Sequence, residues 1–323
     1  MKILIIGLGS IGKRHLACLR EYDDIEIWSL RRSESKEDAA DFSDRTFYND
    51  EVIAKIHEVS GIIISNPTAF HIPTALFHAK FKIPLFIEKP LGHTMDGVSE
   101  LSHLCKSNHV PVLMGNNLMY HPGILKIENL LSESAIGEVI NVRAQFGTYM
   151  PEWHPNEDFT KSYASLTKLG GGVTLTSIHE INYVTHLFGE IDMVLALEIK
   201  KNILGIDAEE GVEILLRHKN GIVSSINLNY YQVPRRRFCE IVGTEGTLYW
   251  DFWEPYVQVR YRTEKRTINL GSDALSLLKE SYDAQMSHFI EICNQRVNPK
   301  VPLSKGRYDL KIALEILKQI GRR

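Results

Sequence analysis

The sequence predicts an α/β protein, in which a doubly wound parallel sheet is followed by an α+β domain with a large, mostly antiparallel open sheet. Two observations lead to this fold class. Up to about residue 115, short apolar runs alternate with stretches of helical spacing, as in parallel strands joined by crossover helices. Between residues 193 and 269, strand-like segments follow one another with only turn residues between them, as in antiparallel sheets.

The N-terminal alternation begins with the first residues of the chain. Buried parallel strands are expected at residues 3–6, 25–30, 61–65, 85–87 and 110–114. Because the rhythm changes after Gly115, we expect one domain over residues 1–118 and a second over residues 119–323. The 323 residues suffice for two separate cores, since domains usually contain roughly 100–200 residues.

The second domain is expected to begin with a helix after Pro122 and a strand at residues 139–146. An irregular polar segment then leads to a helix that starts near Val173 and ends at Phe188. Further strands are expected at residues 191–200, 212–217, 223–229, 237–242 and 247–251. Helical spacing returns at residues 275–295 and 308–320, and these C-terminal helices can pack on either domain.

Composition excludes several function classes. With 44% hydrophobic residues, 24% charged residues and a net charge of -3, the chain gives no electrostatic reason to expect a nucleic-acid partner. No apolar run approaches the ~20 residues that span a bilayer, and the N-terminal run is too short for a signal peptide. Since the four cysteines form no C-x-x-C pair, we expect no metal centre. These features predict a cytoplasmic protein with no membrane contact.

A glycine motif follows the first predicted strand. Gly7-Leu8-Gly9-Ser10-Ile11-Gly12 has the G-x-G-x-x-G spacing of the Rossmann dinucleotide-binding loop and precedes a helical stretch. The first glycine makes the tight turn, the second admits the pyrophosphate and the third packs helix against strand. The helix N-terminus then binds the phosphates. We expect the cofactor to contact Gly7, Gly9, Ser10, Ile11 and Gly12.

The end of the second predicted strand bears on the choice of cofactor. An acid there binds the ribose hydroxyls of NAD, whereas arginine accommodates the 2′-phosphate of NADP. This strand ends in Trp28-Ser29-Leu30-Arg31-Arg32-Ser33, which contains no acid. We therefore favour NADP(H) over NAD(H), with Ser29, Arg31 and Arg32 as phosphate contacts. The alternative is that these arginines lie in a solvated turn.

Further motifs follow in order along nearly the whole chain. They are Asn66-Pro67-Thr68-Ala69-Phe70-His71, Glu88-Lys89-Pro90-Leu91-Gly92, Asn117-Leu118-Met119-Tyr120-His121-Pro122, Ile136-Gly137-Glu138-Val139, Leu169-Gly170-Gly171-Gly172 and His179-Glu180-Ile181. With the glycine loop, they resemble the glucose-fructose oxidoreductase, inositol dehydrogenase and MocA (Gfo/Idh/MocA) family of NAD(P)-dependent oxidoreductases. The resemblance implies further cofactor contacts from Asn66, Pro67, Thr68, His71, Glu88, Lys89, Pro90 and Asn117.

Lys89 is the first candidate catalytic residue. It follows the carboxyl end of a predicted parallel strand, the sheet edge at which ligands bind in such folds. Burial near a cationic nicotinamide would lower its ordinary pKa of ~10.4 and make it a usable proton donor. The resemblance implies that this lysine contacts both the cofactor and a substrate hydroxyl.

His179 is the second candidate. On the helix expected from Val173, its face would include Leu175, Thr176, Asn182 and Tyr183. The resemblance implies a catalytic histidine here, with an aspartate three or four residues earlier that would orient the imidazole. Leu175 or Thr176 stands in the place of that acid, and Thr176 aligns better when counted from the glycine triplet. Thr176 can hydrogen-bond without stabilising an imidazolium comparably. The alternative for His179 is a capping or core histidine.

The loop after the strand at residues 139–146 interleaves aromatic and polar side chains. Such a loop suits stacking on a sugar ring, although it is as often simple packing. The resemblance, above all to members associated with bacterial surface-sugar biosynthesis, implies a sugar or sugar-derivative substrate. The expected substrate contacts are Lys89, Tyr120, Trp153, Tyr163, Thr176 and His179. The run Arg235-Arg236-Arg237 is either a solvated strand edge or a contact for a substrate phosphate or carboxylate.

These features together predict an NAD(P)-dependent oxidoreductase that moves hydride between nicotinamide and a sugar hydroxyl or ketone carbon. One alternative is an enzyme that uses the cofactor transiently in a non-redox reaction of a sugar. Another is a cofactor-binding regulatory protein with a degraded catalytic helix. A homodimer or homotetramer is expected, because the second sheet would otherwise leave one face to solvent.

Overall fold

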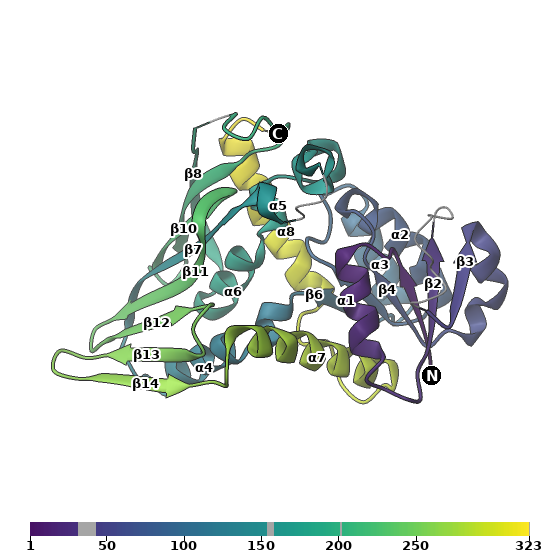
Figure 1. Cartoon of the computed structure of the whole chain (residues 1–323), viewed down its shortest axis with the longest axis horizontal. Coiled ribbons are helices and arrows are strands. Elements are labelled where there is room, and N and C mark those ends of the chain that lie inside the picture. Colours follow the sequence, from purple (N-terminus) through teal and green to yellow (C-terminus); the bar gives the residue numbers. More distant parts are fainter. Residues whose placement is uncertain (32–42, 154–157, 201, 323) are drawn as a thin grey trace. The chain divides into compact units, whose positions relative to one another are not determined.

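The computed structural model describes residues 1–31, 43–153, 158–200 and 202–322 (Figure 1). Its chain forms two compact units, of which the first comprises residues 1–116 and 282–310. The second comprises residues 117–281 and 311–323. The division after Asn116 falls slightly before the boundary expected after residue 118, and the segment 282–310 groups with the first unit.

The first unit is built on a six-stranded sheet in the order β3-β2-β1-β4-β5-β6, and all neighbouring strands are parallel. The strands are β1 (Lys2–Ile6), β2 (Glu26–Arg31), β3 (Arg45–Tyr48), β4 (Gly61–Ile64), β5 (Leu85–Glu88) and β6 (Val112–Gly115). This is the strand order of the Rossmann fold. Strand β3 was not expected, because only Phe47 of its four residues is buried and so short a run has no clear periodicity.

Helices cover the parallel sheet. They are α1 (Ser10–Leu19), α2 (His71–His78), α3 (Val98–Ser107) and parts of α7 (Ala274–Cys293) and α8 (Leu303–Gln319), with the 3₁₀ segments η2 (Asn49–Glu58), η3 (Thr68–Phe70) and η4 (Ala79–Phe81). Strands β4 and β5 are buried along their whole length. Burial of both faces explains why these strands are continuous apolar runs rather than alternating ones.

The second unit is built on an eight-stranded sheet in the order β14-β13-β12-β11-β7-β10-β9-β8. Its strands are β7 (Val139–Tyr149), β8 (Ile191–Glu198), β9 (Gly211–His218), β10 (Val223–Asn229), β11 (Tyr231–Gly243), β12 (Thr247–Asp251), β13 (Tyr256–Arg260) and β14 (Lys265–Asn269). Only β7 and β10 pair in parallel. All other neighbours are antiparallel, which confirms the predicted fold class.

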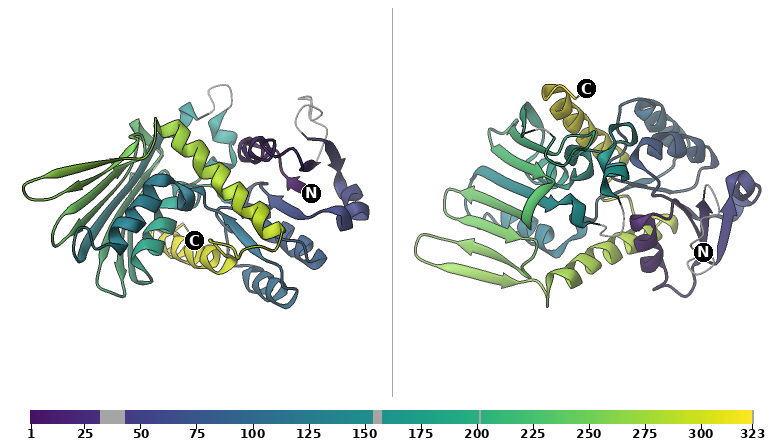
Figure 2. Two further views of the ribbon diagram at one scale, coloured as in Figure 1. Left: turned by 90° about the horizontal axis from the view of Figure 1, so that it is seen from below. Right: turned by 45° about the horizontal axis from the view of Figure 1, so that its top comes forward.

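Helices lie on one face of this sheet (Figure 2). They are α4 (Pro122–Ser132), α5 (Val173–Thr176) and α6 (His179–Phe188). The 3₁₀ turn η5 (Asn117–Tyr120) precedes α4, and η6 (Met150–Glu152), η7 (Phe159–Lys161), η8 (Tyr163–Ser165) and η9 (Thr167–Leu169) lie between β7 and α5. Strand β9 alternates buried Ile214 and Leu216 with exposed side chains, as expected for a sheet covered on one face. Across the described residues, the structure contains no helix that is long and apolar enough to traverse a membrane.

Candidate functional site

The glycine loop lies between β1 and α1. Gly7 has a φ of +96°, which favours glycine, and a Cβ there would approach the Asn66 backbone nitrogen to 2.7 Å. A Cβ on Gly12 would come within 2.1 Å of the Gly7 carbonyl oxygen. Gly9, in contrast, has nothing within 4 Å of its Cβ position and caps α1 without a side-chain hydrogen bond. The loop therefore leaves open space in front of a helix N-terminus, which fits a dinucleotide pyrophosphate.

The other candidate cofactor contacts of the first unit follow strands of the same sheet. Asn66, Pro67 and Thr68 come soon after β4, and Lys89 and Pro90 come directly after β5. Because these strands are parallel to β1, their carboxyl ends meet at the edge that carries the glycine loop. The structure thus brings these segments to one sheet edge.

Two residues expected to touch the cofactor, His71 and Glu88, make contacts within the protein. His71 is buried, and its ring nitrogens lie 2.8 Å from the carbonyl oxygens of Pro90 and Asn66. Burial lowers the pKa of His71. Glu88 is also buried, and its carboxylate pairs with His15 at 2.7 Å. Both side chains therefore hold the neighbouring backbone.

The three residues that were expected to contact a 2′-phosphate are Ser29, Arg31 and Arg32, at and after the end of β2. Ser29 is fully buried, and its hydroxyl lies 2.9 Å from the Ser43 hydroxyl and 3.1 Å from that of Thr46. The expectation that Ser29 binds a 2′-phosphate is therefore not supported, because its hydroxyl is enclosed against β3. Arg31 ends β2 and is half-buried. Arg32 lies outside the described residues.

In the second unit, the helix expected from Val173 to Phe188 is interrupted. Helix α5 ends at Thr176, Ser177 leaves helical geometry with φ -105° and ψ 36°, and α6 begins at His179. The β-branched residues of α5 have low helix propensity, which is consistent with so short a helix. Thr176 and His179 thus lie on different helices, so the shared face predicted for them is wrong, and both are buried.

Thr176 and Trp153 have a common neighbour that sequence reasoning missed, Tyr230. Burial raises the pKa of Tyr230 well above its usual value, and a hydrogen bond with Thr176 acts in the opposite direction. The Trp153 ring meets Tyr230 edge-on at 5.2 Å, and its indole nitrogen donates to the Thr148 hydroxyl at 3.1 Å. Thr176 thus has a phenol as a neighbour where the resemblance implied a carboxylate.

The remaining candidate contacts of this unit differ in exposure. Asn117 is buried and donates to the Ser281 hydroxyl at 3.0 Å. Tyr120 is buried as well, which raises the pKa of its phenol. Tyr163 is 40% exposed, so it is the most accessible aromatic ring among the candidate substrate contacts.

The run Arg235-Arg236-Arg237 lies on β11, and its third member differs from the other two in its surroundings. Arg235 and Arg236 are exposed, whereas Arg237 donates to the fully buried Glu180 at 2.8 Å. The Arg237 guanidinium also lies 4.3 Å from the Phe146 ring centroid. Neither earlier interpretation of the run anticipated this pair, which joins the sheet to the first turn of α6 beside His179.

A buried histidine in this unit gives a pH-dependent prediction. Burial, together with the Arg237 charge, lowers the pKa of His121 to about 4. Between its unfolded pKa of about 6.5 and that value, the unfolded chain binds a proton that the folded chain does not, so stability falls as the pH falls. The free energy of unfolding lost through His121 amounts to about 2 kcal/mol at pH 5.

The variant His121→Asn tests this pH dependence. The His121 ring accepts a hydrogen bond from the Gly123 N–H at the start of α4, and an asparagine oxygen can replace that acceptor without titrating. Urea denaturation at pH 7 and pH 5 should therefore show a weaker pH dependence in the variant. Equal pH dependence in both proteins would contradict the assignment.

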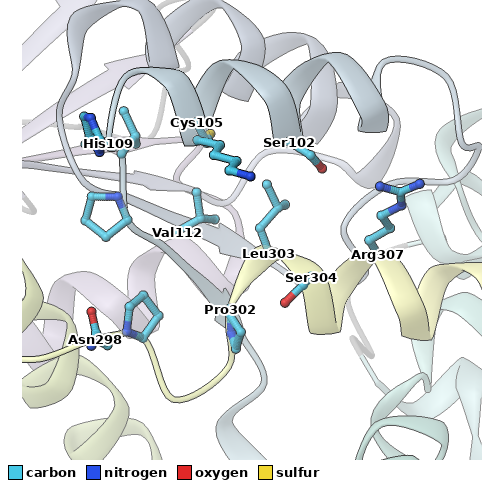
Figure 3. A pocket seen from close by; sticks show the side chains of 13 residues that line it. Ser102, Cys105, His109, Val112, Asn298, Pro302, Leu303, Ser304 and Arg307 are labelled. Atoms are coloured by element: carbon cyan, nitrogen blue, oxygen red, sulfur yellow. The ribbon is translucent and has the colours of Figure 1, made fainter. Parts of the chain in front are cut away.

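A separate hollow of about 530 Å³ lies in the first unit between α3, the start of β6 and the start of α8 (Figure 3). It is at the amino end of β6, whereas the glycine loop follows the carboxyl end of β1. Burial raises the pKa of its Cys105 thiol to about 11, so this thiol stays protonated and unreactive. None of the predicted site residues lines this hollow. Within the described residues, no group of three or more His, Cys, Asp or Glu side chains could hold a metal ion.

The strand order and the open second glycine make the first unit a dinucleotide-binding domain. Residues 1–116 match the family model described as "Oxidoreductase family, NAD-binding Rossmann fold". Residues 124–249 match the model of the GFO/IDH/MocA C-terminal domain. The chain therefore belongs to the Gfo/Idh/MocA family of oxidoreductases, is an enzyme and binds a nicotinamide cofactor.

Individual relatives are distant in sequence. D-apiose dehydrogenase of Paraburkholderia graminis is 23% identical, over 95% of this chain and 83% of that protein. Myo-inositol 2-dehydrogenase of Thermotoga maritima is 22% identical, over 99% of this chain and 96% of that protein. A solved structure of levoglucosan dehydrogenase with NADH and levoglucosan is 18% identical and has a TM-score of 0.86, covering 100% and 97% of the two chains.

Proposed function

We propose that this enzyme transfers hydride between nicotinamide and a hydroxyl or ketone carbon of a sugar or sugar derivative. The observation that carries this proposal is the position of Lys89, half-buried at the carboxyl end of β5 on the edge of the glycine loop. The substrates named for the similar dehydrogenases, apiose, myo-inositol and levoglucosan, support a polyhydroxylated ring or chain.

Two residues carry the chemistry in this proposal. The bound cofactor supplies or accepts the hydride. Lys89 donates a hydrogen bond to the reacting oxygen, and His179 moves the proton of that oxygen. Thr176, a neighbour of Tyr230, stands three residues before His179, where the resemblance implies a carboxylate.

A panel of sugars, polyols and sugar acids tests the reaction, with the absorbance of the reduced cofactor as readout. Turnover with at least one compound is expected. A protein that binds the cofactor but oxidises or reduces nothing in the panel would favour the non-redox or regulatory alternatives. Product formed without a net change in the oxidation state of the cofactor would identify the non-redox alternative.

We further propose that the cofactor is NADP(H). The proposal rests on Arg31 at the end of β2 and on the absence of an acid in Trp28-Ser29-Leu30-Arg31-Arg32-Ser33. NADPH should bind more tightly than NADH, and Arg31→Ala should weaken NADPH binding roughly 10-fold, as for one charged hydrogen bond. Fluorescence titration measures both constants, and NADH is the internal control because it lacks the 2′-phosphate. Equal weakening of both cofactors would exclude a 2′-phosphate contact.

Exposed apolar side chains on the second sheet support the proposal of a homodimer or homotetramer. Its strands expose Met193, Leu195, Leu197 and Leu215, and Leu197 is 74% exposed. Leu195 and Leu215 are paired neighbours on β8 and β9, so their side chains lie on the same face. A contiguous apolar surface of this kind is typical of an interface. The mass measured by light scattering after gel filtration tests this proposal, and a monomer would contradict it.

A further inference from the structure

The Glu88 carboxylate makes two contacts in the core of the first unit. One oxygen lies 2.7 Å from Nε2 of His15, and the other accepts a hydrogen bond from the Lys89 backbone N–H at 3.1 Å. The side chains of His15 and Glu88 are only 1% and 5% exposed. Water therefore cannot substitute for either partner, and a buried carboxylate that lost its donor would be strongly destabilised.

The surroundings leave this carboxylate little room to move. His15 meets the Phe86 ring edge-on at 4.9 Å and the Tyr282 ring at 6.3 Å. On the side of β6, a Cβ at Gly115 would lie 2.7 Å from the Glu88 carboxyl group, so the strand backbone passes directly beside it. The carboxylate is thus held by His15 on one side and by β6 on another.

A second buried histidine holds the backbone on the other side of Lys89. His71 contacts the Pro90 carbonyl oxygen at 2.8 Å through Nδ1 and the Asn66 carbonyl oxygen at 2.8 Å through Nε2. The residues before and after Lys89 are therefore each bound to an imidazole. His15 lies on α1, the helix that starts at the glycine loop, so it links that helix to Lys89 through Glu88.

We propose that His15 is a positioning residue for the reaction, acting through the Glu88 carboxylate on the backbone of Lys89. This inference rests on the proposed catalytic role of Lys89. A lysine amine that donates to a reacting oxygen must start from a fixed backbone position, because a misplacement of about 1 Å can cost about 100-fold in rate. His15 supplies the donor that keeps Glu88, and with it the Lys89 amide, in place.

Two variants of His15 with side chains of similar size distinguish this positioning role from a role in packing alone. His15→Gln keeps a nitrogen donor at about the reach of Nε2, whereas His15→Met fills similar space without a donor. In His15→Met, kcat should fall between about 10-fold and 100-fold with the Kd for NADPH unchanged. His15→Gln should recover kcat to within about threefold of the wild type. Equal kcat in the two variants would overturn the proposal.

A spectroscopic measurement does not depend on activity. In cofactor-free protein labelled with ¹⁵N-histidine, the His15 ring N–H bonded to Glu88 should give a downfield resonance that exchanges slowly with water. Absence of such a resonance overturns the proposal. Its assignment rests on its selective loss in His15→Gln.

Lys89→Ala separates this inference from the proposed function. Wild-type turnover in Lys89→Ala would overturn the role of Lys89 and the positioning role together. A large loss in Lys89→Ala with full turnover in His15→Met would overturn only the positioning role.

Discussion

Replacing Lys89 by alanine is expected to lower kcat by at least about 100-fold, the loss typical of removing a positioned general acid or base. The side chain is half-buried and extends from the end of β5, while its backbone is held through Glu88. Since Glu88 accepts a hydrogen bond from the Lys89 backbone N–H, which alanine retains, the truncation should leave that hydrogen bond intact. Steady-state kinetics with a substrate found in the sugar panel measures the effect.

Lys82→Ala is the matched control for this variant. Lys82 is exposed and follows η4 shortly before β5, so its loss should leave kcat unchanged. The melting temperature of Lys89→Ala should stay close to that of the wild type. Turnover in Lys89→Ala within a few-fold of the wild type would remove Lys89 from the mechanism.

Replacing Arg237 by methionine is expected to destabilise the protein by about 3–5 kcal/mol, because it leaves the Glu180 carboxylate buried without its cation. The Glu180 side chain is 0% exposed and that of Arg237 is 12% exposed, so solvent does not screen the pair appreciably. The Phe146 ring beside Arg237 cannot replace the lost donor. Chemical denaturation measures the free energy of unfolding.

The arginine run itself supplies the control. Arg235 is exposed and lies over the Trp253 ring at 3.7 Å, so Arg235→Met should cost less than about 1 kcal/mol. The double variant Arg237→Met, Glu180→Met removes both charges and should recover most of the lost stability. Equal stability losses from the Arg235 and Arg237 substitutions would contradict the buried pair.

Much of the fold could be predicted because its signals are local. The buried strands of the first sheet are continuous apolar runs, and the alternation on β9 marks a sheet with one open face. The short strand β3 escaped prediction because four residues with one buried side chain show no clear periodicity. The break at Ser177 escaped it because the apolar spacing continues through both helices. His15 was missed although Gly12, His15, Leu16 and Leu19 have the spacing of a buried helix face.

The sequence by itself determined the fold class, the dinucleotide loop and the position of Lys89 at the end of a strand, because each follows from periodicity or from a short contiguous motif. Only the tertiary structure decided which arginine is buried and which partner holds Glu88. Arg237 is opposite Phe146 in the sheet and pairs with Glu180 on α6, while Glu88 meets a histidine 73 residues earlier in the chain. Such pairs depend on strand register and helix packing between distant segments, which no local pattern encodes.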